Sequence, residues 1–252
     1  GNINSKEIKK LLSLFKLKIS SFEEIDLDAD LITYIDFNIN KNFKLNNLTY
    51  NSKGTINNLK FKILKNKKIK KFLPEFNSEI TFIDTKVEYN KSSIKLEGKA
   101  KFTNEFEDIK IIQSYNKKNK EYTISGFSTL NNSSINISTI NYKKEKKLSS
   151  NINFKIKFIL NEYFLIKDLK YSENKSIIVI NNLKFNNNVE LISLKKIQIK
   201  TYLNNQKNND FLVQKNDFIT IKGEVFDAQP LLKSLYKNSS KKTFSKNFKS
   251  EI

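Results

Sequence analysis

Long stretches of this sequence alternate between apolar and polar residues with a period of two. The alternation is clearest at 152–160, where Ile and Phe are separated mainly by Asn and Lys, and it recurs at 26–40, 59–63 and 94–102. Successive side chains of a β-strand point to opposite faces, so this pattern predicts strands with one apolar and one wet face. A chain built of such strands must bury the apolar faces against a second sheet, a helix or a ligand.

Less regular alternation predicts further strands, joined by short polar connectors rich in Asn. These segments are 79–89, 107–115, 120–129, 133–142, 163–171, 175–185, 190–203, 210–214 and 217–226. Asn tolerates the left-handed backbone conformation and suits tight turns, so the connectors predict hairpins. Strands without intervening helical patterns favour an antiparallel meander over βαβ units.

The two ends of the chain and one internal stretch depart from this pattern. Residues 5–17 have apolar side chains at helical spacing, which predicts an amphipathic helix within an N-terminal segment 1–20. A lysine-rich stretch at 65–76 is weakly helical, and Asp227 and Pro230 are typical of the first turn of a short C-terminal helix. We therefore expect a β domain over 21–237 and a disordered tail or linker over 238–252.

Composition excludes several kinds of chemistry. The chain has 46 basic residues, all of them lysine, and 26 acidic residues, for a formal charge of +20, and it contains no His or Cys. Nucleophilic systems based on His or Cys, ordinary zinc sites and disulfides are therefore absent. Five widely spaced glycines exclude the common phosphate-binding loops. We expect no catalytic residue, metal or cofactor, and so no enzyme.

One acidic cluster resembles the first half of a calcium-binding loop. Asp26, Asp28 and Asp30 have the right spacing, but Leu31 replaces the glycine of the sixth position and Phe37 the glutamate of the twelfth. The three carboxylates are better explained as the wet face of a strand.

The lysines allow three interpretations. They form a solvated strand face, contact an anionic membrane, or bind nucleic acid through phosphates. Arginine, which favours bidentate phosphate and base recognition, is absent, and this argues against nucleic acid.

Three segments together resemble a known family. They are the Lys-Lys-Leu-Leu of 9–12, the Asp-Ala-Asp-Leu of 28–31 followed by Leu-Thr-Tyr-Asn-Ser-Lys-Gly at 48–54, and Gly-Glu-Val-Phe-Asp-Ala-Gln-Pro-Leu-Leu at 223–232. Their order and composition resemble the AsmA-like bacterial envelope proteins of the YhdP and TamB type. The resemblance spans most of residues 5–237.

The resemblance implies a long, twisted antiparallel β-meander that forms an open groove. It also implies a periplasmic protein that is anchored in the inner membrane by a segment outside this chain. Its partners would be the membrane and phospholipid, whose acyl chains move along the groove toward the outer membrane, and not nucleic acid. The chain begins with Gly and lacks Met, so we expect an internal fragment of the parent protein or a processed product.

On this reading the candidate groove residues are apolar members of the alternating segments. They are Leu31, Ile35, Phe37, Leu96, Ala100, Phe102, Phe154, Ile156 and Phe158. Two alternatives remain open: a surface-exposed β-sandwich that acts as an interaction or adhesin domain, and a nucleic-acid binder that depends on its lysines.

Overall fold

The computed structural model describes residues 2–3, 22–63, 74–230 and 232–233. Nearly all strands join one antiparallel sheet of 13 strands, and a separate pair, β8 and β9, forms a small second sheet. The strands of the large sheet are β1 Asn2–Ile3, β2 Phe22–Ile39, β3 Leu45–Ile63, β4 Glu79–Asn90, β5 Ser93–Lys101, β6 Phe106–Asn116, β7 Glu121–Thr129, β10 Ser150–Ile159, β11 Tyr163–Glu173, β12 Ser176–Asn186, β13 Leu191–Leu203, β14 Gln206–Lys215 and β15 Ile219–Val225.

The strand order of the large sheet follows the sequence, with one interruption between β7 and β10. This confirms the predicted antiparallel meander. The interruption corrects one prediction: 133–142 does not contribute a strand to the large sheet. It forms β8 (Ile135–Ile137), a 3₁₀ turn over Ser138–Ile140 and the start of β9 (Tyr142–Lys144). We call 130–149 the insertion.

Asn residues occupy turn positions, as the sequence predicts. Asn161, Asn174, Asn204 and Asn205 all have positive φ angles, between 47° and 63°. At the β4–β5 turn, the side-chain oxygen of Asn90 accepts hydrogen bonds from the backbone N–H groups of Ser92 at 3.0 Å and Ser93 at 2.9 Å. Asn therefore serves these turns in two ways: it adopts the left-handed conformation that glycine usually supplies, and its side chain binds the backbone of the turn.

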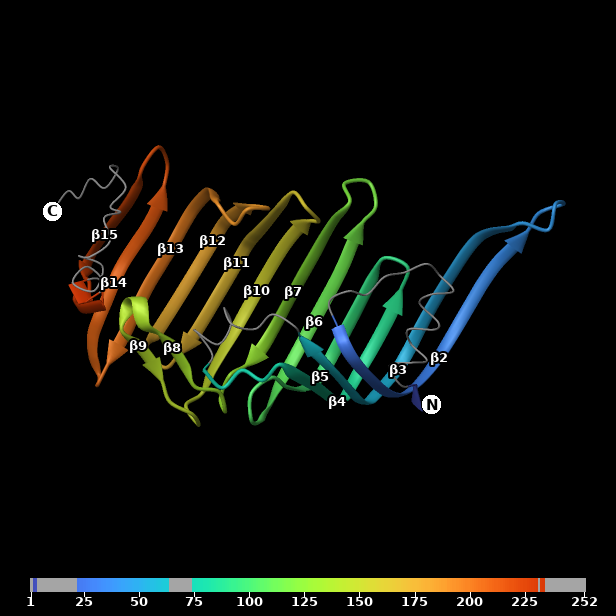
Figure 1. Ribbon diagram of the computed structural model, residues 1–252, viewed down its shortest axis with the longest axis horizontal. Coiled ribbons are helices and arrows are strands. Elements are labelled where there is room, and N and C mark those ends of the chain that lie inside the picture. Colours follow the sequence, from blue (N-terminus) through green and yellow to red (C-terminus); the bar gives the residue numbers. More distant parts are fainter. Residues whose placement is uncertain (1, 4–21, 64–73, 231, 234–252) are drawn as a thin grey trace.

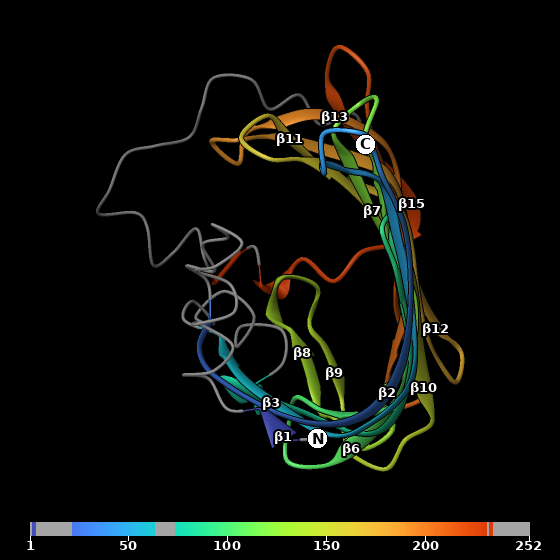
Figure 2. The same cartoon turned by 90° about the vertical axis from the view of Figure 1, so that its right-hand side faces the viewer.

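The large sheet is an open, strongly curved trough. The strands run side by side along its length (Figure 1), and an end-on view shows them bending together into a C shape (Figure 2). Since neighbouring strands lie about 4.8 Å apart, the trough is roughly 50–60 Å long. The predicted open groove is therefore present, and the described residues do not form the second large sheet of a sandwich.

The insertion lies inside the curve of the trough (Figure 2). Its Ile135, Ile140 and Tyr142 pack into one buried cluster with Tyr171 and Ile178 of the large sheet. The concave face of the sheet is therefore its apolar face. Two smaller clusters lie on the part formed by β2 to β6, around Ile56 and Val87 and around Phe82 and Ala100.

The chain ends are only partly described. The predicted N-terminal helix at 5–17, most of the 65–76 stretch and the tail at 238–252 lie outside the described residues. After β15, residues 229–230 and 232–233 are helical. The side chain of Asp227 accepts a hydrogen bond from the N–H of Gln229 at 3.1 Å, which is the N-cap that the sequence predicts.

Candidate binding groove

One uninterrupted apolar row crosses the concave face. Each member is the direct cross-strand partner of the next, from β2 to β15. This central row consists of Leu31, Gly54, Val87, Leu96, Ile111, Gly126, Phe154, Leu169, Ile180, Ile197, Val213 and Ile221. Most of these residues are half-buried rather than sealed. The row is an apolar strip that runs along the trough, perpendicular to the strands.

The register places five of the nine predicted groove residues together. Leu31, Leu96 and Phe154 belong to the central row. Ile156 lies one pleat further along β10, between Ile124 of β7 and Ile166 of β11, and Phe158 lies one pleat beyond it. All of these except Leu31 are half-buried, and Leu31 is exposed.

The other four predicted residues lie elsewhere. Ala100 is only 2% exposed, in the buried cluster with Phe82, so it supports the groove from within the packing. Phe102 follows β5 and packs against both that cluster and the insertion cluster. Ile35 and Phe37 lie on the exposed end of β2, and their side chains are 61% and 47% exposed. The two-residue alternation assigns a side chain to one face of a strand, but it does not show whether that position is buried in a cluster, open to the groove or fully exposed.

An aromatic row lies on one side of the central row. It consists of Tyr115, Tyr122, Phe158, Phe164 and Phe185, again as cross-strand partners. The rings of Tyr122 and Phe158 are stacked with centroids 5.1 Å apart, and those of Tyr115 and Tyr122 are 4.6 Å apart. A cavity of about 320 Å³ opens beside Phe158, Phe164, Phe185 and Val189. This side of the trough therefore presents an open apolar surface.

The insertion covers the other side of the central row. There the sheet residues are Tyr171, Ile178, Ile199 and Phe211, which are cross-strand partners and form one cluster with the insertion. Polar contacts extend across the same face, because the side chain of Asn209 donates to the carbonyl of Ile140 at 2.7 Å. The insertion thus narrows the trough to a strip along the central and aromatic rows.

A buried glutamate fixes the base of the insertion. Glu107 of β6 is 2% exposed, and its carboxylate accepts hydrogen bonds from the N–H of Asn131 at 3.0 Å and of Asn132 at 2.7 Å. The hydroxyls of Thr129 and Ser133 also donate to it, at 2.8 and 3.1 Å. Four donors satisfy this charge, which is how a buried carboxylate is retained in a fold.

A buried lysine binds the backbone carbonyls of the same loop. The ammonium of Lys144 donates to the carbonyls of Leu130 at 2.6 Å, Ser133 at 2.7 Å and Asn131 at 3.2 Å, and the residue is fully buried. Burial lowers the pKa of Lys144, whereas the negative charges of Glu107 and Glu173 oppose that shift. Loop 130–133 is therefore held by two buried charged groups, one that binds its N–H groups and one that binds its carbonyls, and the insertion is a fixed part of the fold.

Sequence reasoning missed both anchors. Lys144 lies in a run of charged residues that is typical of a solvated connector, and Glu107 lies in an ordinary strand. Neither position carries a local signal of burial, because the partners come from chain segments that meet only in the folded structure.

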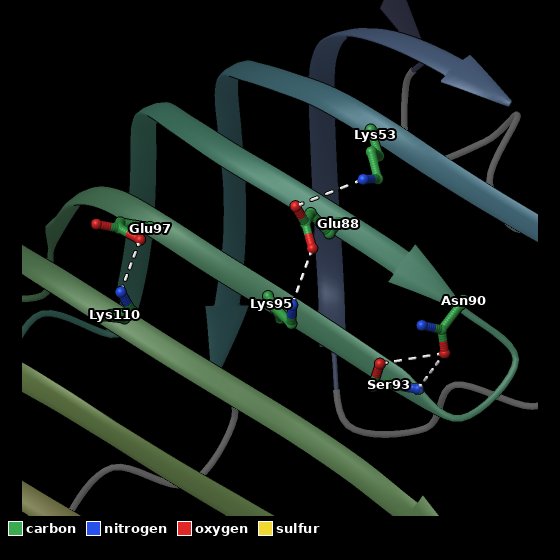
Figure 3. Close-up of polar contacts among 7 residues, drawn as sticks. All are labelled: Lys53, Glu88, Asn90, Ser93, Lys95, Glu97 and Lys110. Carbon is green, nitrogen blue, oxygen red and sulfur yellow. Dashed lines mark hydrogen bonds and ion pairs between the residues drawn. The ribbon is translucent and has the colours of Figure 1, made fainter.

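The lysines of the convex face are partly neutralised by glutamates on neighbouring strands. Figure 3 shows Glu88 between Lys53 and Lys95, at 3.8 and 3.0 Å, and Lys110 beside Glu97 at 3.0 Å. Lys95 lowers the pKa of Glu88, chiefly through their hydrogen bond. These pairs are solvent-exposed, so they contribute little to stability, and they weaken the field that a phosphate backbone would meet.

Neither a metal site nor a membrane-spanning helix occurs in the described part of the chain. No group of three or more Asp or Glu side chains there is placed to hold a cation. No helix within the described ranges is long and apolar enough to cross a bilayer.

The chain was compared with protein families, curated proteins and solved structures. No protein-family model matches the sequence, and no curated protein or solved structure is significantly similar to it.

Proposed function

We propose that the chain is a lipid-carrying segment of an AsmA-like envelope protein. The acyl chains of phospholipids lie along the central and aromatic rows, and the headgroups face the solvent in the open mouth of the trough. The supporting observation is the central row, which crosses twelve strands, from Leu31 to Ile221, without a charged or polar side chain.

The physical chemistry of the groove suits this ligand. Burying an acyl chain gains about 0.8 kcal/mol per CH₂ group, and a flexible chain adapts to a long, shallow apolar strip. Half-buried residues such as Ile124 and Ile166 complete their burial when such a chain covers them. The central row has no charged side chain, so a lipid tail that covers this row desolvates none of its members.

The same proposal places the protein in the periplasm, anchored in the inner membrane by a segment outside this chain. It acts without catalysis, as one length of a conduit that carries phospholipid toward the outer membrane. This part of the proposal rests on the sequence resemblance described above.

Two neighbouring residues on opposite faces of β6 provide a sharp test. Ile111 belongs to the central row, whereas Ile112 lies on the convex face between Lys95 and Ser125, and both are half-buried. A diazirine-bearing amino acid at 111 is expected to crosslink to phospholipid during expression in bacteria, because it lies in the groove. The same group at 112 is expected to give several-fold fewer lipid adducts by mass spectrometry. Equal labelling at the two positions would contradict the proposal.

A further inference from the structure

The hairpin formed by β2 and β3 projects beyond the rest of the sheet (Figure 1). Pairing of β3 with β4 ends at Asn51 and Asn90, whereas β2 and β3 continue to pair as far as Ile39 and Leu45. Beyond Asn51 the two strands therefore form a two-stranded ribbon. We call residues 35–50 the ribbon. An isolated two-stranded ribbon gains little from its own packing, so its side chains are available to a partner.

The ribbon exposes large apolar side chains, and the exposure continues on both faces of β2 where the ribbon begins. Ile35 and Ile39 are 61% and 58% exposed, and the adjacent Ile32 and Tyr34, which alternate with them, are 65% and 70% exposed. Within the ribbon itself, the apolar Ile35, Phe37 and Ile39 alternate with the polar Asp36 and Asn38. A ribbon with one apolar and one polar face suits a boundary between an apolar medium and water, such as the interfacial region of a bilayer.

Phe43 at the tip of the ribbon is the most exposed of the large apolar side chains described, at 91%. Its φ angle is 54°, in the left-handed region that a bulky residue rarely adopts. The turn is closed by hydrogen bonds from the N–H of Phe43 to the carbonyl of Asn40 at 2.9 Å and from the N–H of Lys44 to the Asn40 side chain at 3.0 Å. A strained backbone that presents an aromatic ring to solvent points to a functional role for the ring.

The charge around this tip has one sign. Lys41 and Lys44 flank Phe43, both are exposed, and no acidic residue occurs between Asp36 and Glu75 in the sequence. Lysines beside an exposed aromatic ring match an anionic lipid surface, where the ring enters the headgroup region and each ammonium meets phosphate.

We propose that the ribbon is a membrane-docking element that inserts Phe43 into the interfacial region of an anionic bilayer, with Lys41 and Lys44 on the lipid phosphates. Insertion is shallow, because the ribbon has unpaired backbone edges that hydrocarbon cannot satisfy. The inference goes beyond the proposed lipid groove. Its test is also separate, because docking on vesicles requires no lipid in the trough.

The chain contains no tryptophan, so Phe43→Trp gives a single indole reporter. With vesicles of phosphatidylcholine containing one third phosphatidylglycerol, its emission is expected to shift to the blue and to be quenched by lipids brominated near the headgroup. Leu148→Trp is the matched control, because Leu148 is 46% exposed in the insertion, away from the ribbon. Absence of a shift at position 43, or an equal shift at 148, would overturn the proposal. So would a shift at 43 that needs only more protein and no vesicles, since that indicates a second copy as the partner.

Affinity measurements separate the ring from the charges. Phe43→Asn keeps a residue that accepts the left-handed turn, and it is expected to weaken vesicle binding by about tenfold to a hundredfold, the effect of losing one buried aromatic side chain. Lys41→Gln with Lys44→Gln is expected to weaken binding by about tenfold or more and to reduce its salt dependence. The control, Lys99→Gln with Lys170→Gln, removes the same charge from exposed convex-face positions and is expected to change binding far less. Equal losses in the two pairs, or no loss for Phe43→Asn, would contradict docking through the tip.

Discussion

Replacing Glu107 with alanine is expected to lower the free energy of unfolding by about 3–5 kcal/mol, the range for removing one partner from a buried charged network. The substitution leaves the N–H groups of Asn131 and Asn132 without their acceptor, and an unsatisfied buried donor costs about 1–3 kcal/mol. It also removes a negative charge that favours the buried ammonium of Lys144. Urea unfolding followed by circular dichroism measures the change.

Glu105→Ala is the matched control for this prediction. Glu105 lies two residues away in the sequence and is exposed, so its removal is expected to change stability by less than about 0.5 kcal/mol. Hydrogen exchange gives a local readout, since faster exchange of the insertion is expected in Glu107→Ala and not in Glu105→Ala. A loss of stability no larger than that of the control would show that Glu107 does not anchor the insertion.

Replacing Ile156 with lysine is expected to abolish most lipid binding while the chain remains folded. Ile156 lies on the open side of the central row, between Ile124 and Ile166. The long lysine side chain can extend into the open trough and keep its charge in water, so the sheet tolerates it. An acyl chain along the same strip would have to cover that charge, and an unpaired buried charge costs several kcal/mol. Phospholipid that co-purifies with the protein, quantified by mass spectrometry, is expected to fall about tenfold or more.

The control for this experiment is Ile112→Lys. It makes the same chemical change at a half-buried isoleucine on the convex face. Thermal unfolding of both variants shows whether they fold equally well. Retention of lipid by Ile156→Lys at the level of Ile112→Lys would contradict a groove that runs over the concave face. Vesicle binding through Phe43 would be unaffected by that result, so the two proposals can fail separately.

Local pattern was sufficient for most strands of the large sheet. The predicted segments at 107–115, 120–129 and 175–185 match β6, β7 and β12 within about one residue at each end. The strands can be predicted because alternation reflects a local constraint, the opposite orientation of successive side chains. The Asn turns can be predicted for a similar reason, since the conformation of a turn depends on its own residues.

The insertion shows where local pattern fails. The alternating residues at 133–142 suggest another strand of the sheet, yet they fold back over the concave face. Their apolar side chains find the same kind of apolar partners in either arrangement, so periodicity cannot distinguish the two. The choice depends on contacts across large sequence separations, such as Glu107 with Asn132 and Ile140 with Asn209.

The sequence by itself determined that this protein is built of antiparallel strands with one apolar and one lysine-rich face, because each segment alternates apolar and polar residues. Only the tertiary structure decided that the sheet curves into an open trough, that the insertion fills one side of it and that the β2–β3 ribbon projects beyond it. These features depend on strand register, on differences in strand length and on two buried charges, Glu107 and Lys144. Each of these features depends on contacts between segments that are distant in the sequence, so no local sequence pattern predicts it.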